Sequence, residues 1–134
     1  MQYRRLLSLL LLVELVCGFA VATFAQDKDE PETVLVVYRP KAGQEAALLE
    51  VLKKDWATVK RLKLVDEQPH LLVQAKDDAG KTVFVETFTW VSAETPDHVP
   101  AEVQAIWGEM GKLVETREGH PGVDFRAVSV LADR

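Results

Sequence analysis

The sequence predicts an α+β fold of the ferredoxin-like type, with the order βαββαβ and a four-stranded antiparallel sheet. Three observations predict it. Two stretches repeat apolar residues at helical spacing, and four short stretches are rich in β-branched and aromatic residues. Their order along the chain is the one that folds as a single unit with both helices on one face of the sheet.

Residues 33–62 supply the first strand and the first helix. The strand covers residues 33–38, which are apolar and β-branched, and Arg39-Pro40 ends it. The helix begins after Gly43, because apolar residues then recur three or four positions apart. These residues are Leu48, Leu52, Trp56, Val59 and Leu62.

A β-hairpin follows the first helix. Residues 70–75 and 82–91 are the predicted second and third strands. The segment between them is polar, and its Gly80 is free to take the positive φ that tight turns require.

The second helix and the last strand complete the unit. A connector at residues 92–100 contains two prolines, and the helix after it ends before Gly119, Pro121 and Gly122. The last strand is predicted at residues 123–131. The apolar stripe of the helix consists of Val103, Ile106, Trp107, Met110, Leu113 and Val114.

Both faces of the predicted sheet are apolar. In the first strand, Val34, Val36 and Tyr38 point to one side, while Leu35 and Val37 point to the other. An antiparallel sheet with one face in water should alternate apolar and polar residues, and this strand does not. Two helices cover only one face, so the sequence predicts a homodimer in which sheet packs on sheet.

The N-terminus has the features of a secretory signal peptide, predicted at residues 1–25. Arg4 and Arg5 precede an apolar stretch, and small residues lead to a cleavage position after Ala25. A retained membrane anchor is the alternative, which Glu14 disfavours because a carboxylate at mid-membrane costs about 2.5–3.5 kcal/mol. The domain is therefore expected outside the cytoplasm, in a periplasm or the extracellular space, with membrane contact only if the segment is uncleaved.

The mature chain is then a disordered lead-in at residues 26–32 and one domain at residues 33–134. The single cysteine, Cys17, leaves with the signal, so no disulfide or thiol nucleophile remains. Without Arg4, Arg5 and Glu14 the chain keeps 14 basic and 20 acidic side chains, a net charge of −6. No basic stripe is present, and a nucleic-acid partner is not expected.

The mature chain resembles the antibiotic-biosynthesis-monooxygenase-like domains of the dimeric α+β barrel superfamily. The resemblance rests on the element order, on the strand Val85 to Trp90 running into Ser92 and Glu94, and on the helix from Pro100 to Met110. It implies a dimeric α+β barrel. The superfamily includes cofactor-independent oxygenases of aromatic compounds, haem-degrading enzymes and proteins without known activity, so the fold does not decide the function.

The resemblance also implies site residues. Trp90 matches the strand tryptophan that lines the pocket of the oxygenases, and His98 lies near the connector histidine of many members. The alternatives are a core aromatic for Trp90 and an exposed loop histidine for His98. The chain contains no asparagine, so the pocket asparagine of the oxygenases and haem degraders is missing.

Glu86 is the single charge in an otherwise apolar strand, and it shares one side with Phe84, Phe88 and Trp90. Burying a carboxylate is costly unless it is paired or its pKa rises. One interpretation makes Glu86 a catalytic acid or base, and the other makes it half of a buried ion pair with Arg126.

Two function classes follow from these residues, and a purely structural dimer without a ligand is a third option. The first is a binding or accessory module that holds a small apolar or aromatic molecule between sheet and helices. The second is a cofactor-independent oxygenase acting on an aromatic substrate. If the chain is an enzyme, Glu86 and His98 are the candidate catalytic residues. Phe84, Phe88, Trp90 and Trp107 are the candidate binding residues. The three histidines match no compact ligand motif, so neither a metal nor another cofactor is expected.

Overall fold

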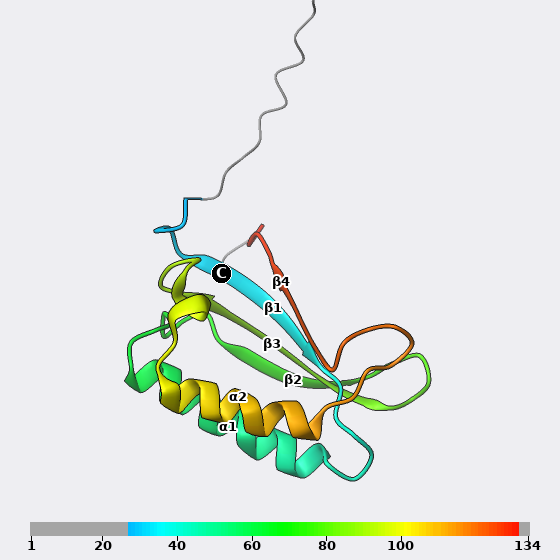
Figure 1. Cartoon of the computed structure of the whole chain (residues 1–134). Coiled ribbons are helices and arrows are strands. Elements are labelled where there is room, and N and C mark those ends of the chain that lie inside the picture. Colours follow the sequence, from blue (N-terminus) through cyan, green and yellow to red (C-terminus); the bar gives the residue numbers. More distant parts are fainter. Residues whose placement is uncertain (1–26, 132–134) are drawn as a thin grey trace, which may run out of the picture.

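A four-stranded antiparallel sheet carries both helices on one of its faces in the computed structural model, which describes residues 27–131 (Figure 1). The strands lie in the order β2-β3-β1-β4. The predicted ferredoxin-like βαββαβ fold is confirmed. The elements are β1 (Glu32–Tyr38), α1 (Glu45–Arg61), β2 (Leu71–Lys76), β3 (Thr82–Trp90), the 3-10 helix η1 (Thr95–His98), α2 (Ala101–Leu113) and β4 (Val123–Ala127).

The last strand is shorter than the predicted range of residues 123–131. β4 is an edge strand that pairs only with β1, and their register runs from Tyr38↔Val123 to Val34↔Ala127. A final hydrogen bond joins Val128 N to the Thr33 carbonyl. Because β1 begins at Glu32, little backbone remains to pair with the residues that follow.

The core lies between the helices and one face of the sheet. Along β1 and β3 every second side chain points to the helices and is buried, as the alternation of the sequence predicts. The helices supply Leu48, Leu52 and Val59 from α1, and Val103, Ile106 and Met110 from α2. The sheet supplies Val34, Val36, Tyr38, Phe84, Glu86, Phe88 and Trp90.

The opposite face of the sheet carries apolar side chains without a covering layer in the part of the chain described. Leu35, Val37 and Val85 are half-buried there, and Leu71 and Val73 on β2 are exposed. Both helices lie on one face of the sheet (Figure 1), so the face that carries these apolar side chains is left uncovered in the single chain.

Arg117 connects the two loops at one end of the sheet. Its side chain, only 9% exposed, forms ion pairs with Asp77 in the β2–β3 turn and with Glu115 after α2. It also donates to the backbone carbonyls of Thr82 and Pro40. One side chain thereby holds together the hairpin turn, the end of β1 and the segment that leads to β4.

The predicted signal peptide at residues 1–25 lies outside the described residues. Part of the predicted lead-in is attached to the domain, because the Glu30 carbonyl accepts a hydrogen bond from Ala93 N and Glu32 already belongs to β1. No helix in residues 27–131 has the length and apolar character needed to cross a membrane.

Candidate functional site

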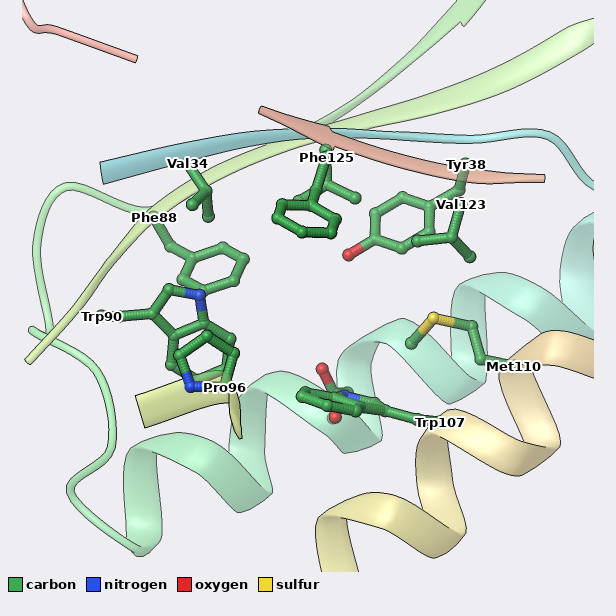
Figure 2. Close-up of a pocket in the computed structure, with 11 residues that line it drawn as sticks. Val34, Tyr38, Phe88, Trp90, Pro96, Trp107, Met110, Val123 and Phe125 are labelled. Carbon is green, nitrogen blue, oxygen red and sulfur yellow. The ribbon is translucent and has the colours of Figure 1, made fainter. Parts of the chain in front are cut away.

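A cavity of about 380 Å³ lies between the helices and the sheet, and we call it the sheet–helix cavity (Figure 2). Its lining is almost entirely apolar or aromatic. Phe125 of the edge strand β4 is 67% exposed and points into the cavity, so this side is open to solvent (Figure 2). The lining residues are Val34, Val36, Tyr38, Asp55, Phe88, Trp90, Pro96, Trp107, Met110, Val123 and Phe125.

Three aromatic rings form a corner of this cavity. The ring centroids of Phe88 and Trp90 are 5.0 Å apart, and those of Trp90 and Trp107 are 6.3 Å apart. Both pairs have an interplanar angle of 76°. Such edge-to-face contacts are favourable because the positive edge of one ring meets the negative face of the next. They fix the orientation of the two indole rings relative to each other.

Glu86 is the centre of a buried hydrogen-bond network. It is 3% exposed, and its Oε2 accepts a 2.7 Å hydrogen bond from the Tyr38 hydroxyl. Its Oε1 is 2.9 Å from Nε2 of His70, whose side chain is 19% exposed. The His70 ring stacks on Trp56 of α1 at a centroid distance of 3.6 Å. The network therefore runs from the Tyr38 hydroxyl at the cavity to a histidine near the surface.

The strand register brings these groups together. Val36 of β1 and Leu72 of β2 both pair with Glu86 of β3, one on each side. Tyr38 and His70 are each two residues from these partners, and therefore lie on the same face of the sheet as Glu86.

Asp55 of α1 is the one carboxylate among the lining residues. Its Oδ1 is buried and has no hydrogen-bond partner among the described residues. Burial and the nearby Glu86 carboxylate raise the pKa of Asp55 to about 7, and the Trp107 side chain partly opposes this increase. Burial, followed by Glu86 and Asp55, also raises the pKa of Tyr38 well above its ordinary value. The cavity thus contains a carboxyl group that can gain or lose a proton near neutral pH.

No family model and no curated protein sequence matches the chain. Solved structures do match its fold. One is a protein from Chloroflexus aurantiacus described provisionally as an antibiotic biosynthesis monooxygenase, with 15% identity, a TM-score of 0.53, and coverage of 78% of this chain and 97% of that chain. Another, from Bacteroides thetaiotaomicron and described in the same way, has 9% identity, a TM-score of 0.54, and coverage of 79% and 94%. Rv0793 from Mycobacterium tuberculosis has 14% identity, a TM-score of 0.52, and coverage of 78% and 98%.

The chain has the antibiotic-biosynthesis-monooxygenase-like fold. At these identities the likeness establishes the fold and leaves the chemistry to the residues of this chain. The resemblance predicted from the sequence is confirmed at this level.

Within this monooxygenase-like domain the candidate binding residues lie in different places. Phe88, Trp90 and Trp107 line the sheet–helix cavity, Trp90 from the sheet and Trp107 from α2 (Figure 2). Phe84 is buried in the core and is absent from the lining. Phe84 pairs with Tyr38 in the sheet, but of these two residues only Tyr38 lines the cavity.

The two candidate catalytic residues lie at different distances from the cavity. Glu86 is buried behind Tyr38 and reaches the cavity only through the Tyr38 hydroxyl. His98 is exposed at the end of η1, and η1 contributes Pro96 to the lining instead. The structure therefore places Glu86 next to the cavity wall and does not bring His98 into it.

The predicted ion pair between Glu86 and Arg126 is wrong. Arg126 is exposed, and its guanidinium is 3.4 Å from Asp124 on the same strand. Arg126 pairs with Leu35 in the sheet, whereas Glu86 pairs with Val36. Successive residues of a strand point to opposite faces, so the two side chains lie on opposite sides of the sheet.

Asp55 and His70 were not among the residues predicted for the site. Asp55 follows Leu52 by three positions and precedes Val59 by four, so the helical spacing does place it on the buried stripe of α1. The interaction of His70 with Glu86 has no comparable signal, because it depends on the strand register. In residues 27–131 no group of three or more His, Cys, Asp or Glu side chains is arranged to hold a metal ion.

Proposed function

We propose that this chain is an exported monooxygenase-like protein that binds a small apolar or aromatic molecule in the sheet–helix cavity. The observation that carries the proposal is the cavity itself, about 380 Å³ and walled by Tyr38, Phe88, Trp90 and Trp107. Ligand sites in proteins have volumes of about 300–1,000 Å³ and are mainly apolar with a few polar groups. Asp55 and the Tyr38 hydroxyl are such groups here.

Cofactor-independent oxygenation of an aromatic substrate is the second candidate, and Asp55 is the observation that favours it. A carboxyl group with a pKa of about 7 can accept a proton from a bound hydroxyl and return it later. In such a reaction the hydroxyl proton would pass to Asp55 and leave an electron-rich oxyanion in an aromatic cavity. The buried Tyr38–Glu86–His70 network adds a second acid–base path to the same cavity.

Binding and oxygen uptake distinguish the two candidates. We expect isothermal titration calorimetry to show saturable binding of one-ring or two-ring aromatic molecules, and Trp90→Ala to abolish it. Lys53→Ala, on the exposed side of α1, is the control and should bind as the wild type does. Oxygen consumption with a hydroquinone would support the oxygenase, and binding without consumption would support the binding module. Absence of binding across the whole series would contradict the proposed function.

We also propose that the active form is a homodimer in which two apolar sheet faces pack together. The supporting observation is the uncovered face formed by Leu35, Val37 and Val85, with Leu71 and Val73 beside them. A second copy presents the same patch and can cover it by two-fold symmetry. Such a contact would bury on the order of 1,600 Å² or more in total.

Export is proposed from the N-terminal sequence. Arg4 and Arg5, the apolar segment after them and the small residues up to Ala25 make up the three parts of a cleavable signal. Intact mass or N-terminal sequencing of protein from its native host should show a chain that begins near Gln26. A soluble cytoplasmic protein that retains Met1 would contradict this part of the proposal.

A further inference from the structure

The polar groups of the sheet–helix cavity are negative or neutral. Of the described residues that line it, Asp55 is acidic, and none is a lysine, arginine or histidine. The Glu86 carboxylate lies directly behind the Tyr38 hydroxyl, at 2.7 Å. Since Tyr38 donates its only hydroxyl proton to Glu86, its oxygen is free to act as an acceptor toward the cavity. An anionic ligand would meet two carboxylates here without a compensating positive charge.

The aromatic walls suit a positive charge. Phe88, Trp90 and Trp107 form two successive perpendicular contacts, and Tyr38 and Phe125 complete the ring of aromatic side chains (Figure 2). A cation beside tryptophan, tyrosine or phenylalanine rings is attracted to their negative faces, most strongly where water is excluded. Trp90 and Phe88 are both buried, which provides this condition.

Asp55 supplies the anchoring group. Its Oδ1 is buried in the single chain and has no hydrogen-bond partner among the described residues. A buried polar atom without a hydrogen-bond partner is uncommon in a folded protein. It indicates that a hydrogen-bond donor from outside the chain completes the site. A buried carboxylate is stabilised most by a donor that also carries positive charge.

We infer that the ligand of this cavity is an organic cation, a protonated amine on an apolar or aromatic body. Its ammonium group donates a hydrogen bond to Asp55 Oδ1, and its body packs among Phe88, Trp90 and Trp107. The inference rests on the proposed function, namely that the sheet–helix cavity binds a small molecule, and it adds the charge that this molecule carries.

Three probes of nearly equal size test which ligand charge the cavity prefers. They are 2-phenylethylamine, which is a cation at pH 8, the neutral 2-phenylethanol and the anionic phenylacetate. In calorimetric titrations at pH 8 we expect the amine to bind about tenfold or more tightly than the alcohol, since a charged hydrogen bond is stronger than a neutral one. Phenylacetate should bind more weakly than both.

Asp55→Asn should remove the preference for the cation. It keeps the shape of the side chain, so 2-phenylethanol should bind it as it binds the wild type, while the affinity for the amine falls to that of the alcohol. Glu50→Gln is the matched control, because it removes one negative charge from the exposed side of the same helix. This variant should retain the full preference for the amine.

A pH titration of the wild type provides a test that does not depend on a variant. The affinity for the amine should fall between pH 8 and pH 5.5, as Asp55 becomes protonated, and the affinity for 2-phenylethanol should change much less. The other titratable groups that face Asp55 are Tyr38 from β1 and Glu86 from β3, with His70 bonded behind Glu86. The residues of α2 and β4 that line the cavity do not titrate. Asp55→Asn retains Tyr38, Glu86 and His70, so a pH effect that persists in it would not belong to Asp55.

The outcomes separate the two proposals. If 2-phenylethanol binds as tightly as the amine, the inference of a cationic ligand is overturned, while the proposed binding function stands. If phenylacetate binds best, the inference is overturned in the same way. If none of the probes binds, the proposed function fails, and the inference fails with it.

Discussion

The hydroxyl of Tyr38 on β1 donates a 2.7 Å hydrogen bond to Oε2 of Glu86 on β3, underneath the two helices. Both groups are buried, and the remaining carboxylate oxygen is bonded to His70. The only charge in the sequence of β3 is therefore satisfied by a phenol and an imidazole, and no guanidinium takes part.

Tyr38→Phe is expected to destabilise the domain. It removes the donor to Glu86 Oε2 and leaves a buried carboxylate oxygen unpaired, which costs about 1–3 kcal/mol. Urea denaturation monitored by circular dichroism would measure the free energy of unfolding. Arg126→Ala is the control, because Arg126 is exposed and should change stability by less than about 0.5 kcal/mol. A larger loss in Arg126→Ala than in Tyr38→Phe would contradict the network described above.

Asp55→Asn is expected to stabilise the free protein at pH 8 and to leave it nearly unchanged at pH 4. The pKa of Asp55 is raised from 3.8 to about 7 in the folded chain, chiefly by burial. The folded state therefore holds a proton that the unfolded state releases, and stability is lost as the pH rises between about 4 and 7. A shift of this size corresponds to up to about 4 kcal/mol.

Thermal unfolding of both proteins at several pH values would measure this difference. The gain in melting temperature of Asp55→Asn should grow steadily from pH 4 to pH 7 and then level off. A gain that is the same at every pH would show that Asp55 does not titrate in this range.

Val37→Arg is expected to dissociate the proposed homodimer without unfolding the chain. Val37 is half-buried on the sheet face away from the helices, so an arginine there meets solvent in the monomer and a second apolar sheet in the dimer. Light scattering at micromolar concentration would give the mass of each protein. A wild-type protein that is monomeric under these conditions would refute the dimer. Val36→Arg is expected to have a different effect from Val37→Arg. Val36 is 5% exposed beneath the helices, so its replacement by arginine should unfold the domain.

Arg117→Ala is expected to cost on the order of 2–3 kcal/mol, because the carbonyls of Pro40 and Thr82 lose charged donors at once. The hairpin turn should also become more mobile, since Arg117 joins Asp77 to the segment after α2. Hydrogen exchange of residues 76–82 would report this loosening. Arg61→Ala provides the comparison, since Arg61 pairs with Glu102 on the exposed side of the helices. Equal exchange in the two variants would mean that Arg117 does not hold the turn.

Residue periodicity was sufficient to predict the fold. The spacing of Leu48, Leu52 and Val59 predicts α1, and the alternation of Val34, Val36 and Tyr38 predicts which side chains of β1 face the helices. Both patterns arise from local backbone geometry, because helices repeat about every 3.6 residues and strands every two residues. The end of β4 was not predictable in this way, because it depends on where its partner β1 begins.

The candidate site was predictable only in part. Trp90 and Phe88 share a face by alternation within one strand, and the same reasoning places Glu86 beside them. The partners of Glu86 come from β1 and from the residue before β2, and only the register across three strands decides them. Asp55 has the spacing of a buried residue on α1. However, an aspartate is usually exposed to solvent, so its burial beside the cavity could not be predicted from the sequence.

The corner formed by the aromatic rings has an optical consequence. The chain contains three tryptophans, of which Trp90 and Trp107 line the sheet–helix cavity, while Trp56 stacks on His70 behind it. Every indole in the protein is therefore a natural fluorophore at or beside one site. The intrinsic emission of the unlabelled protein should respond to occupancy of this cavity with almost no background from the rest of the molecule.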